Sequence, residues 1–138
     1  MKIYFDGGCR PNPGKMETAV VMRGRLHVRS NAGQGTSEQA EWLSLIHAID
    51  LARAARYRDV LLLGDAASVI DQAVNGARCR SPETRASLGR FEEALRGFDR
   101  VRLRHVKRSQ NLAGIALGQL REGRRIGGCT GLTEGATE

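Results

Sequence analysis

The 138-residue chain contains several short apolar runs typical of strands and a long segment whose apolar residues recur at helical spacing. Together they predict an α/β fold. Residues 2–5 form a β-prone run that ends at Asp6, and the Gly- and Pro-rich residues 7–14 predict an ordered loop after it. Residues 18–22 and 25–29 predict two further strands, joined by a glycine-containing hairpin turn.

A helix is expected to begin after Thr36, because Thr36-Ser37-Glu38-Gln39 has the form of a capping box. Its apolar residues recur at helical spacing to about residue 55. The predicted apolar face consists of Trp42, Leu45, Ile46, Ile49 and Ala52. At about 100° per residue, Glu41 lies on the border of that face and not on its exposed back.

The second half of the chain continues the alternation of helices and strands. Residues 60–63 are apolar at every position, which is typical of a central parallel strand covered on both faces, and the run ends at Gly64-Asp65. The other predicted elements are helices over about 67–74, 82–97 and 112–122 and a strand over 101–106. The pattern predicts one domain over residues 1–124, with five strands in a sheet flanked by helices, and a flexible tail over residues 125–138.

Charge adds a class of partner to this picture. The chain has 22 Lys and Arg against 15 Asp and Glu, a formal charge of +7, and its basic residues recur in short groups at 100–108 and 121–125. Such groups favour a polyanion through phosphate contacts and counterion release. A solvated basic surface without a nucleic-acid ligand explains the charge equally well at this stage.

Two further features bear on the compartment. No apolar run is long enough to cross a membrane and no leader-like segment opens the chain, so we expect a soluble, cytoplasmic protein without membrane contact. Cys9, Cys79 and Cys129 form no CxxC or Cys/His cluster. They fit a reducing compartment and predict no zinc site.

Three acids are the candidates for chemistry. Asp6 and Asp65 follow predicted strands, and ligands of open α/β sheets bind beyond the carboxyl ends of strands. Neighbouring parallel strands are about 4.8 Å apart, so these carboxylates could share cations, with Glu41 as a third ligand. Such a cluster either titrates upward or binds Mg²⁺. Separately, each acid has a structural explanation: Asp6 or Asp65 as a cap, and Glu41 as the partner of an arginine.

Four motifs together resemble the ribonuclease H family, and most closely its short reverse-transcriptase-like members. They are Asp6-Gly7-Gly8-Cys9-Arg10-Pro11-Asn12-Pro13-Gly14, Ala40-Glu41, Gly64-Asp65 and Val106-Lys107-Arg108-Ser109-Gln110-Asn111. The similarity covers about residues 1–120. It implies the ribonuclease H-like fold, in which a five-stranded mixed sheet is flanked by helices.

The resemblance also implies an activity: hydrolysis of the RNA strand of an RNA/DNA hybrid with Mg²⁺ or Mn²⁺ held by Asp6, Glu41 and Asp65. Double-stranded RNA is a further candidate partner. The positions that match nucleic-acid contacts of the family are Gly7, Gly8, Cys9, Arg10, Asn12, Thr36, Ser37, Glu38, Arg108 and Asn111. Contacts to 2′-hydroxyls are the physical means of distinguishing RNA from DNA in a hybrid.

The chain departs from the family pattern at three points. The position of the fourth catalytic carboxylate is Ile115, which cannot hold a cation. Ser37-Glu38 replaces a pair of asparagines, which adds negative charge where the family binds a polyanion. No histidine follows the last strand, and His105 lies within that strand.

Ile115 is not expected to be a core residue of the last helix. Leu112, Ala113, Ala116, Leu117 and Leu120 share one face of that helix, and Ile115 lies roughly 140° from its centre, toward the expected carboxylate position. Two functions therefore stay open: a nuclease, weakened by the missing carboxylate, and a catalytically impaired module that only binds nucleic acid.

Overall fold

The computed structural model describes residues 1–123 and 133–134. Its strands are β1 (Lys2–Cys9), β2 (Gly14–Met22), β3 (Arg25–Arg29), β4 (Gln34–Gly35), β5 (Asp59–Gly64), β6 (Arg100–His105) and β7 (Thr133–Glu134). Its helices are α1 (Ser37–Ala54), α2 (Ala67–Val74), α3 (Pro82–Ala94) and α4 (Leu112–Arg121), with 3₁₀ turns at Gly76–Arg78 and Arg108–Gln110. The predicted order of the five main strands and four helices is confirmed.

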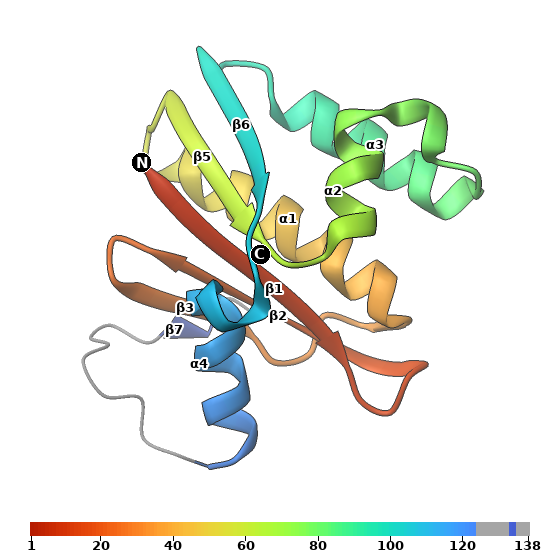
Figure 1. The fold of residues 1–138 in the computed structure, drawn as a ribbon, viewed down its shortest axis with the longest axis vertical. Coiled ribbons are helices and arrows are strands. Elements are labelled where there is room, and N and C mark those ends of the chain that lie inside the picture. The colour runs from red at the N-terminus through yellow and green to blue at the C-terminus, as the bar shows by residue number, and fades with distance from the viewer. Residues whose placement is uncertain (124–132, 135–138) are drawn as a thin grey trace.

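The strands form one mixed sheet in the order β6-β5-β1-β2-β3-β7, with β4 beside β2 (Figure 1). The chain pairs β1 with β5 and β5 with β6 in parallel, and β1 with β2 and β2 with β3 antiparallel. β5 is buried on both faces after its first residue, as its uninterrupted apolar run predicts. The β2–β3 hairpin turns at Arg23-Gly24, both at positive φ, which suits a tight two-residue turn.

Two hydrophobic cores cover the two faces of the sheet. α1, α2 and α3 pack on one face, where Trp42 of α1 meets Phe91 of α3 edge to face, with ring centroids 6.5 Å apart. α4 covers the opposite face through Ala113, Ala116 and Leu117. This arrangement leaves the ends of β1 and β5 accessible between α1 and α4.

The capping box at the start of α1 is confirmed, with Thr36 as the N-cap and Gln39 as its reciprocal partner. All five residues of the predicted apolar face of α1 are buried. On α4 the prediction was wrong for Leu112, which is 47% exposed, whereas its neighbour Ala113 is completely buried against the sheet. Ile115 is 41% exposed, in agreement with its predicted place outside the core.

The first strand is longer than predicted. Gly7, Gly8 and Cys9 were expected in a loop, but they continue β1 and pair with Thr18, Glu17 and Met16 of β2. The pairing overrides the weak strand preference of glycine, because β2 starts early enough to supply partners. Asp6 therefore lies inside β1 and not at its end.

The predicted tail over residues 125–138 lies outside the described residues, apart from Thr133–Glu134, which pair in parallel with β3. Within the described part of the chain, no helix combines the length and apolar character needed to span a bilayer. Cys9 and Cys79 are buried free thiols.

Candidate active site

Three carboxylates from three elements converge at one edge of the sheet. One oxygen each of Asp6 on β1, Glu41 on α1 and Asp65 after β5 lies within 4.8 Å of the other two. The strand register explains this, because the last pair of β1 and β5 is Tyr4 opposite Leu63, and each acid follows two residues later. Asp6 and Asp65 therefore lie at the same level of the sheet, and because side chains alternate along a strand, both point to the same face. The structure thus brings together the three acids that the sequence singled out.

Gly7 determines where Glu41 lies. A Cβ at Gly7 would be 2.1 Å from the carbonyl oxygen of Ala40, so only glycine lets α1 approach β1 this closely. The Gly7 amide donates to Glu41 Oε1 at 3.1 Å. Gly7 was predicted to contact nucleic acid, but it is buried under α1 with its amide engaged. Its role is to position Glu41.

Asn111 ties Asp65 to the rest of the site. Its Nδ2 donates to Asp65 Oδ1 at 3.1 Å and to the Phe5 carbonyl at 3.0 Å, while its Oδ1 accepts from the Ala113 amide as the N-cap of α4. Asn111 is completely buried, so its side chain is not accessible for the predicted contact with nucleic acid. It orients a carboxylate instead.

The cluster is electrostatically costly without a cation. Burial and the neighbouring Asp65 raise the pKa of Asp6 to about 7. Burial and the charge of Asp6 raise the pKa of Glu41 to about 8, although the hydrogen bond from Gly7 lowers it. Hard carboxylate oxygens at this spacing suit a divalent cation, so Asp6, Glu41 and Asp65 fit a divalent-metal site.

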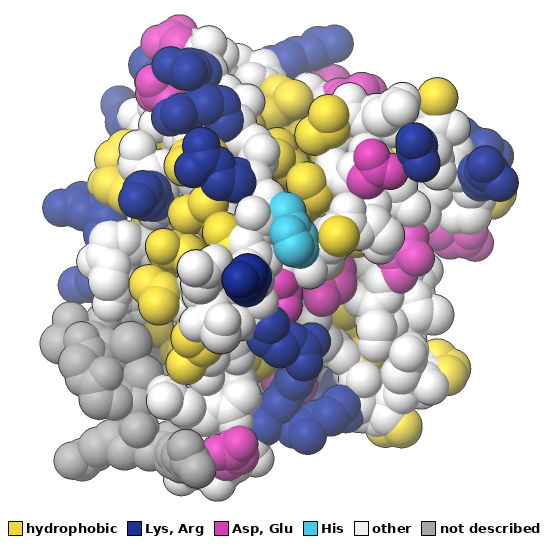
Figure 2. All heavy atoms as spheres, viewed as in Figure 1, with side chains coloured by type: hydrophobic (Ala, Val, Ile, Leu, Met, Phe, Trp, Pro, Cys, Tyr) yellow, Lys and Arg dark blue, Asp and Glu magenta, His cyan; other side chains and the backbone are white. Residues whose placement is uncertain are grey.

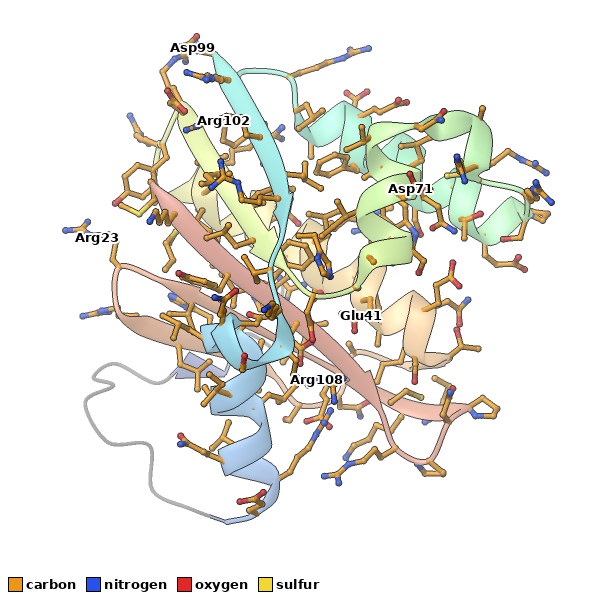
Figure 3. All side chains as sticks on the ribbon, viewed as in Figure 1. Arg23, Glu41, Asp71, Asp99, Arg102 and Arg108 are labelled. Atoms are coloured by element: carbon orange, nitrogen blue, oxygen red, sulfur yellow. The ribbon has the colours of Figure 1, made fainter. Side chains whose placement is uncertain are left out.

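A cavity of about 400 Å³ opens onto the three carboxylates. Six of the residues predicted to bind nucleic acid line it: Gly7, Gly8, Cys9, Arg10, Ser37 and Arg108. Arg108 is 89% exposed and its Nε lies 3.3 Å from Asp65 Oδ2. Figure 3 shows Arg108 beside the edge of the sheet to which Glu41 also points.

α4 borders the cavity with residues that the sequence analysis missed, namely Gly114, Gly118 and Arg121. They form one stripe of the helix at spacings of four and three residues, a signal that was available in the sequence. A Cβ at Gly114 would lie 3.4 Å from Asp6 Oδ2. Gly114, and not Ile115, is therefore the α4 residue that faces Asp6.

Two of the residues predicted to bind nucleic acid, Cys9 and Asn12, have side chains that are hydrogen-bonded within the protein. Cys9 is buried and its thiol donates to the carbonyls of Pro11 and Gly35. Cys9 nevertheless lines the carboxylate cavity, so its contact with nucleic acid stays a prediction, with the thiol itself engaged by the protein. Asn12 Oδ1 accepts from the Ser37 amide at 3.1 Å, which fastens the loop after β1 to the start of α1.

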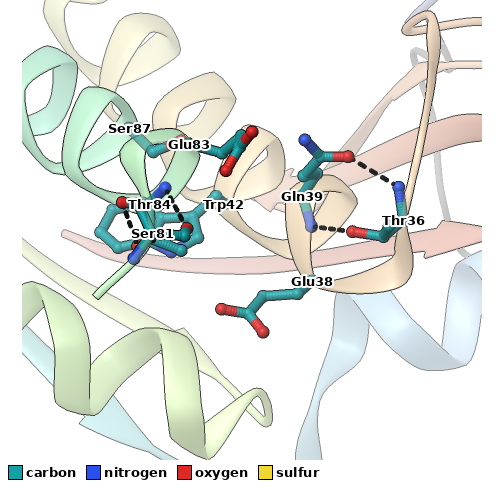
Figure 4. A pocket seen from close by; sticks show the side chains of 8 residues that line it. All are labelled: Thr36, Glu38, Gln39, Trp42, Ser81, Glu83, Thr84 and Ser87. Carbon is teal, nitrogen blue, oxygen red and sulfur yellow. Dashed lines mark hydrogen bonds between the residues drawn. The ribbon is translucent and has the colours of Figure 1, made fainter. Parts of the chain in front are cut away.

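Thr36 and Glu38 border a different cavity, of about 300 Å³, between the starts of α1 and α3 (Figure 4). Glu38 accepts from Gln72 Nε2 at 3.1 Å, and Glu83 of α3 lines the same cavity. The two glutamates make this cavity unfavourable for a phosphate. The predicted role of Glu38 in nucleic-acid binding is not favoured by these surroundings.

Comparison with known proteins agrees with this architecture. The family described as "Reverse transcriptase-like" matches residues 4–120, which is most of the chain. The chain belongs to the ribonuclease H family. Ribonuclease HI of Halobacterium salinarum is 33% identical to it over 119 residues, which is 83% of this chain and 60% of that relative. A ribonuclease H of Mycolicibacterium gilvum is 55% identical over 31 residues, 22% of this chain and 20% of the relative.

Solved ribonuclease H structures share the fold. The RNase H1 of Halobacterium salinarum superposes with a TM-score of 0.77 at 29% identity, over 88% of this chain and 97% of that one. The LC11-RNase H1, solved in complex with an RNA/DNA hybrid, gives 0.73 at 21% identity, over 84% and 91% of the two chains. The chain spans 60% of the length of the ribonuclease HI that it matches in sequence.

Proposed function

We propose that this protein is a metal-dependent endoribonuclease that hydrolyses the RNA strand of RNA/DNA hybrids. The observation that carries the proposal is the convergence of Asp6, Glu41 and Asp65, with oxygens within 4.8 Å of one another, at an open cavity. Membership of the ribonuclease H family supports the same activity.

Asp6, Glu41 and Asp65 would hold one or two Mg²⁺ or Mn²⁺ ions. When bound, such ions supply an activated water and stabilise the leaving oxygen of a phosphodiester. The Asp6 carboxylate interacts electrostatically with both Glu41 and Asp65, so the three groups would act on the same bound ions. The Gly7 amide and the Asn111 side chain keep Glu41 and Asp65 in place before any ligand arrives.

Charge around the cavity favours a nucleic-acid substrate. Arg100, Arg102 and Arg104 alternate along β6 on the face opposite the α1 core, and all three are exposed. Figure 2 shows Lys and Arg side chains on both sides of a group of acidic side chains on this face of the molecule. A phosphate backbone passing the carboxylates would meet cations on either side.

RNA/DNA hybrid is the proposed substrate because the fold is that of the LC11-RNase H1, which was solved with such a hybrid. In this chain Gly8 and Ser37 border the cavity, where a 2′-hydroxyl would be read. Double-stranded RNA is the competing substrate, because it too is a duplex that carries 2′-hydroxyls.

One observation favours a second function, a nucleic-acid-binding module that has lost hydrolysis. α4 contributes Gly114, Gly118 and Arg121 to the cavity, and no carboxylate. With three carboxylates, fewer protein ligands remain for a second ion, and its shell would depend on substrate phosphate and water.

The experiment that tests the proposal is cleavage of labelled duplexes by the wild-type protein, with Mg²⁺, Mn²⁺ or EDTA. We expect cleavage of the RNA strand in the hybrid with either metal, and no cleavage with EDTA. Hybrid binding without cleavage in either metal would support the second function. Cleavage that persists in EDTA would contradict both.

A further inference from the structure

Arg121 is a cation built into the wall of the carboxylate cavity. It is the last residue of α4, its side chain is only 24% exposed, and it lines the same cavity as Asp6, Glu41 and Asp65. Its Nε donates to Glu17 Oε2 at 2.9 Å. Its Nη2 is fully buried and has no hydrogen-bond partner among residues 1–123 and 133–134.

Gly8 makes room for this guanidinium, and two glycines of α4 leave the cavity beside it open. A Cβ at Gly8 would lie 1.9 Å from Arg121 Nη2, so any side chain at that position would displace it. Gly114 and Gly118 occupy the helix stripe between Arg121 and the carboxylates, and a Cβ at Gly118 would meet nothing within 4 Å. No α4 side chain therefore separates the guanidinium from the space above Asp6.

The chemistry of the unpaired donor indicates its ligand. A guanidinium offers several N–H donors in a rigid plane that matches carboxylate and phosphate oxygens, and Glu17 takes up only Nε. A buried donor without an acceptor is unfavourable until an anion reaches it. The charge of Arg121 also lowers the pKa of Asp6, which indicates that its field reaches the carboxylates.

We infer that Arg121 binds a phosphate of the nucleic-acid strand inside the carboxylate cavity. It supplies positive charge on the α4 side, where this chain has no fourth carboxylate to hold an ion. The inference rests on the proposed function and adds to it a residue that contacts the substrate. Arg121 and Arg108 would then bracket the bound strand from the Asp6 side and the Asp65 side.

The competing explanation is that Arg121 only pairs with Glu17. Four variants separate the two: Arg121→Gln, Glu17→Gln, the double variant of both, and Arg90→Gln. Arg90 is exposed on α3, away from the cavity, and provides the matched loss of one positive charge. Hybrid binding is measured in EDTA over a range of salt concentrations, beside the melting temperature of each variant and its cleavage rate in Mg²⁺.

We expect Arg121→Gln to weaken hybrid binding by about tenfold or more, the loss typical of one charge-assisted hydrogen bond, and to reduce the salt slope by about one. The same loss should appear when Arg121→Gln is made in the Glu17→Gln background. Arg90→Gln should leave the salt slope within error of wild type.

Two outcomes would overturn the inference. If wild type binds hybrid and Arg121→Gln binds with unchanged affinity and salt slope, Arg121 is only a partner of Glu17, and the proposed function stands. If wild type neither binds nor cleaves hybrid, the proposed function itself fails, and this inference fails with it.

Discussion

Asp6 and Glu41 make the folded chain sensitive to pH. Their pKa values of about 7 and about 8 lie above the ordinary values of 3.8 and 4.5, chiefly because both carboxyl groups are buried. Between about pH 4 and pH 8 the folded state therefore binds more protons than the unfolded state. The stability that these protons provide is complete below about pH 4 and is lost as pH rises to about 8.

The first prediction follows from this loss of stability as pH rises. In EDTA, the melting temperature of wild type should fall by several degrees between pH 5 and pH 8, relative to that of Asp6→Asn. Mn²⁺ at pH 8 should restore wild type, because a cation stabilises the ionised carboxylates of the folded state. If the melting temperatures of wild type and Asp6→Asn changed with pH in parallel, the carboxylates would not be coupled as described.

A second residue-scale prediction concerns which α4 position faces the site. Gly114→Asp should introduce a carboxylate toward Asp6, lower the metal-free melting temperature and increase the stabilisation by Mn²⁺. Ile115→Asp adds the same charge at an exposed position that does not line the cavity, and should fold with a nearly unchanged melting temperature. A larger metal response in Ile115→Asp would mean that α4 is rotated from the orientation described here.

At the scale of elements, Asn111 joins β1, the end of β5 and α4 through one buried side chain. We predict that Asn111→Ala lowers the free energy of unfolding by about 2–4 kcal/mol, since it removes a helix cap and leaves buried acceptors unpaired. Urea denaturation measures this loss. Asn75→Ala is the control, because Asn75 caps only a short surface turn. Equal losses in the two variants would contradict the role of Asn111 as a tether.

Much of this element structure could be predicted from the sequence, because local signals and tertiary packing agree. The capping box at Thr36 and the apolar face of α1 are examples. The extension of β1 through Gly7 to Cys9 could not, because pairing with a distant strand decides it. The residue facing Asp6 was also missed, since neighbouring α4 positions differ by 100° and only the docking of the helix selects Gly114.

At the scale of the whole molecule, the formal charge of +7 is less informative than its distribution. Arg100 and Arg104 are exposed on β6 and have no carboxylate within 4.0 Å among the described residues, whereas Arg102 pairs with Asp59. The two unpaired arginines extend the basic surface from the carboxylate cavity along the edge strand of the sheet.

This surface predicts how binding depends on salt. The double variant Arg100→Gln/Arg104→Gln should bind hybrid more weakly and lower the salt slope by about two, one for each lost phosphate contact. Arg85→Gln/Arg90→Gln on α3 makes the same change of charge elsewhere, and should keep the wild-type slope. Equal effects of the two double variants would show that net charge alone controls binding.

The central claim is that Asp6, Glu41 and Asp65 form the metal site of a nuclease, and Asp6→Asn tests it most directly. The measurement is the initial rate of RNA-strand cleavage in a labelled RNA/DNA hybrid, with Mg²⁺ and with Mn²⁺, for wild type and Asp6→Asn. Loss of a metal ligand should cost more than the roughly 10–100-fold typical of residues that only support ligands. We therefore predict a fall of more than about 100-fold, with no loss of melting temperature in EDTA, because Asp6 raises the electrostatic cost of the folded state. Wild-type cleavage rates in Asp6→Asn with either metal would contradict the account.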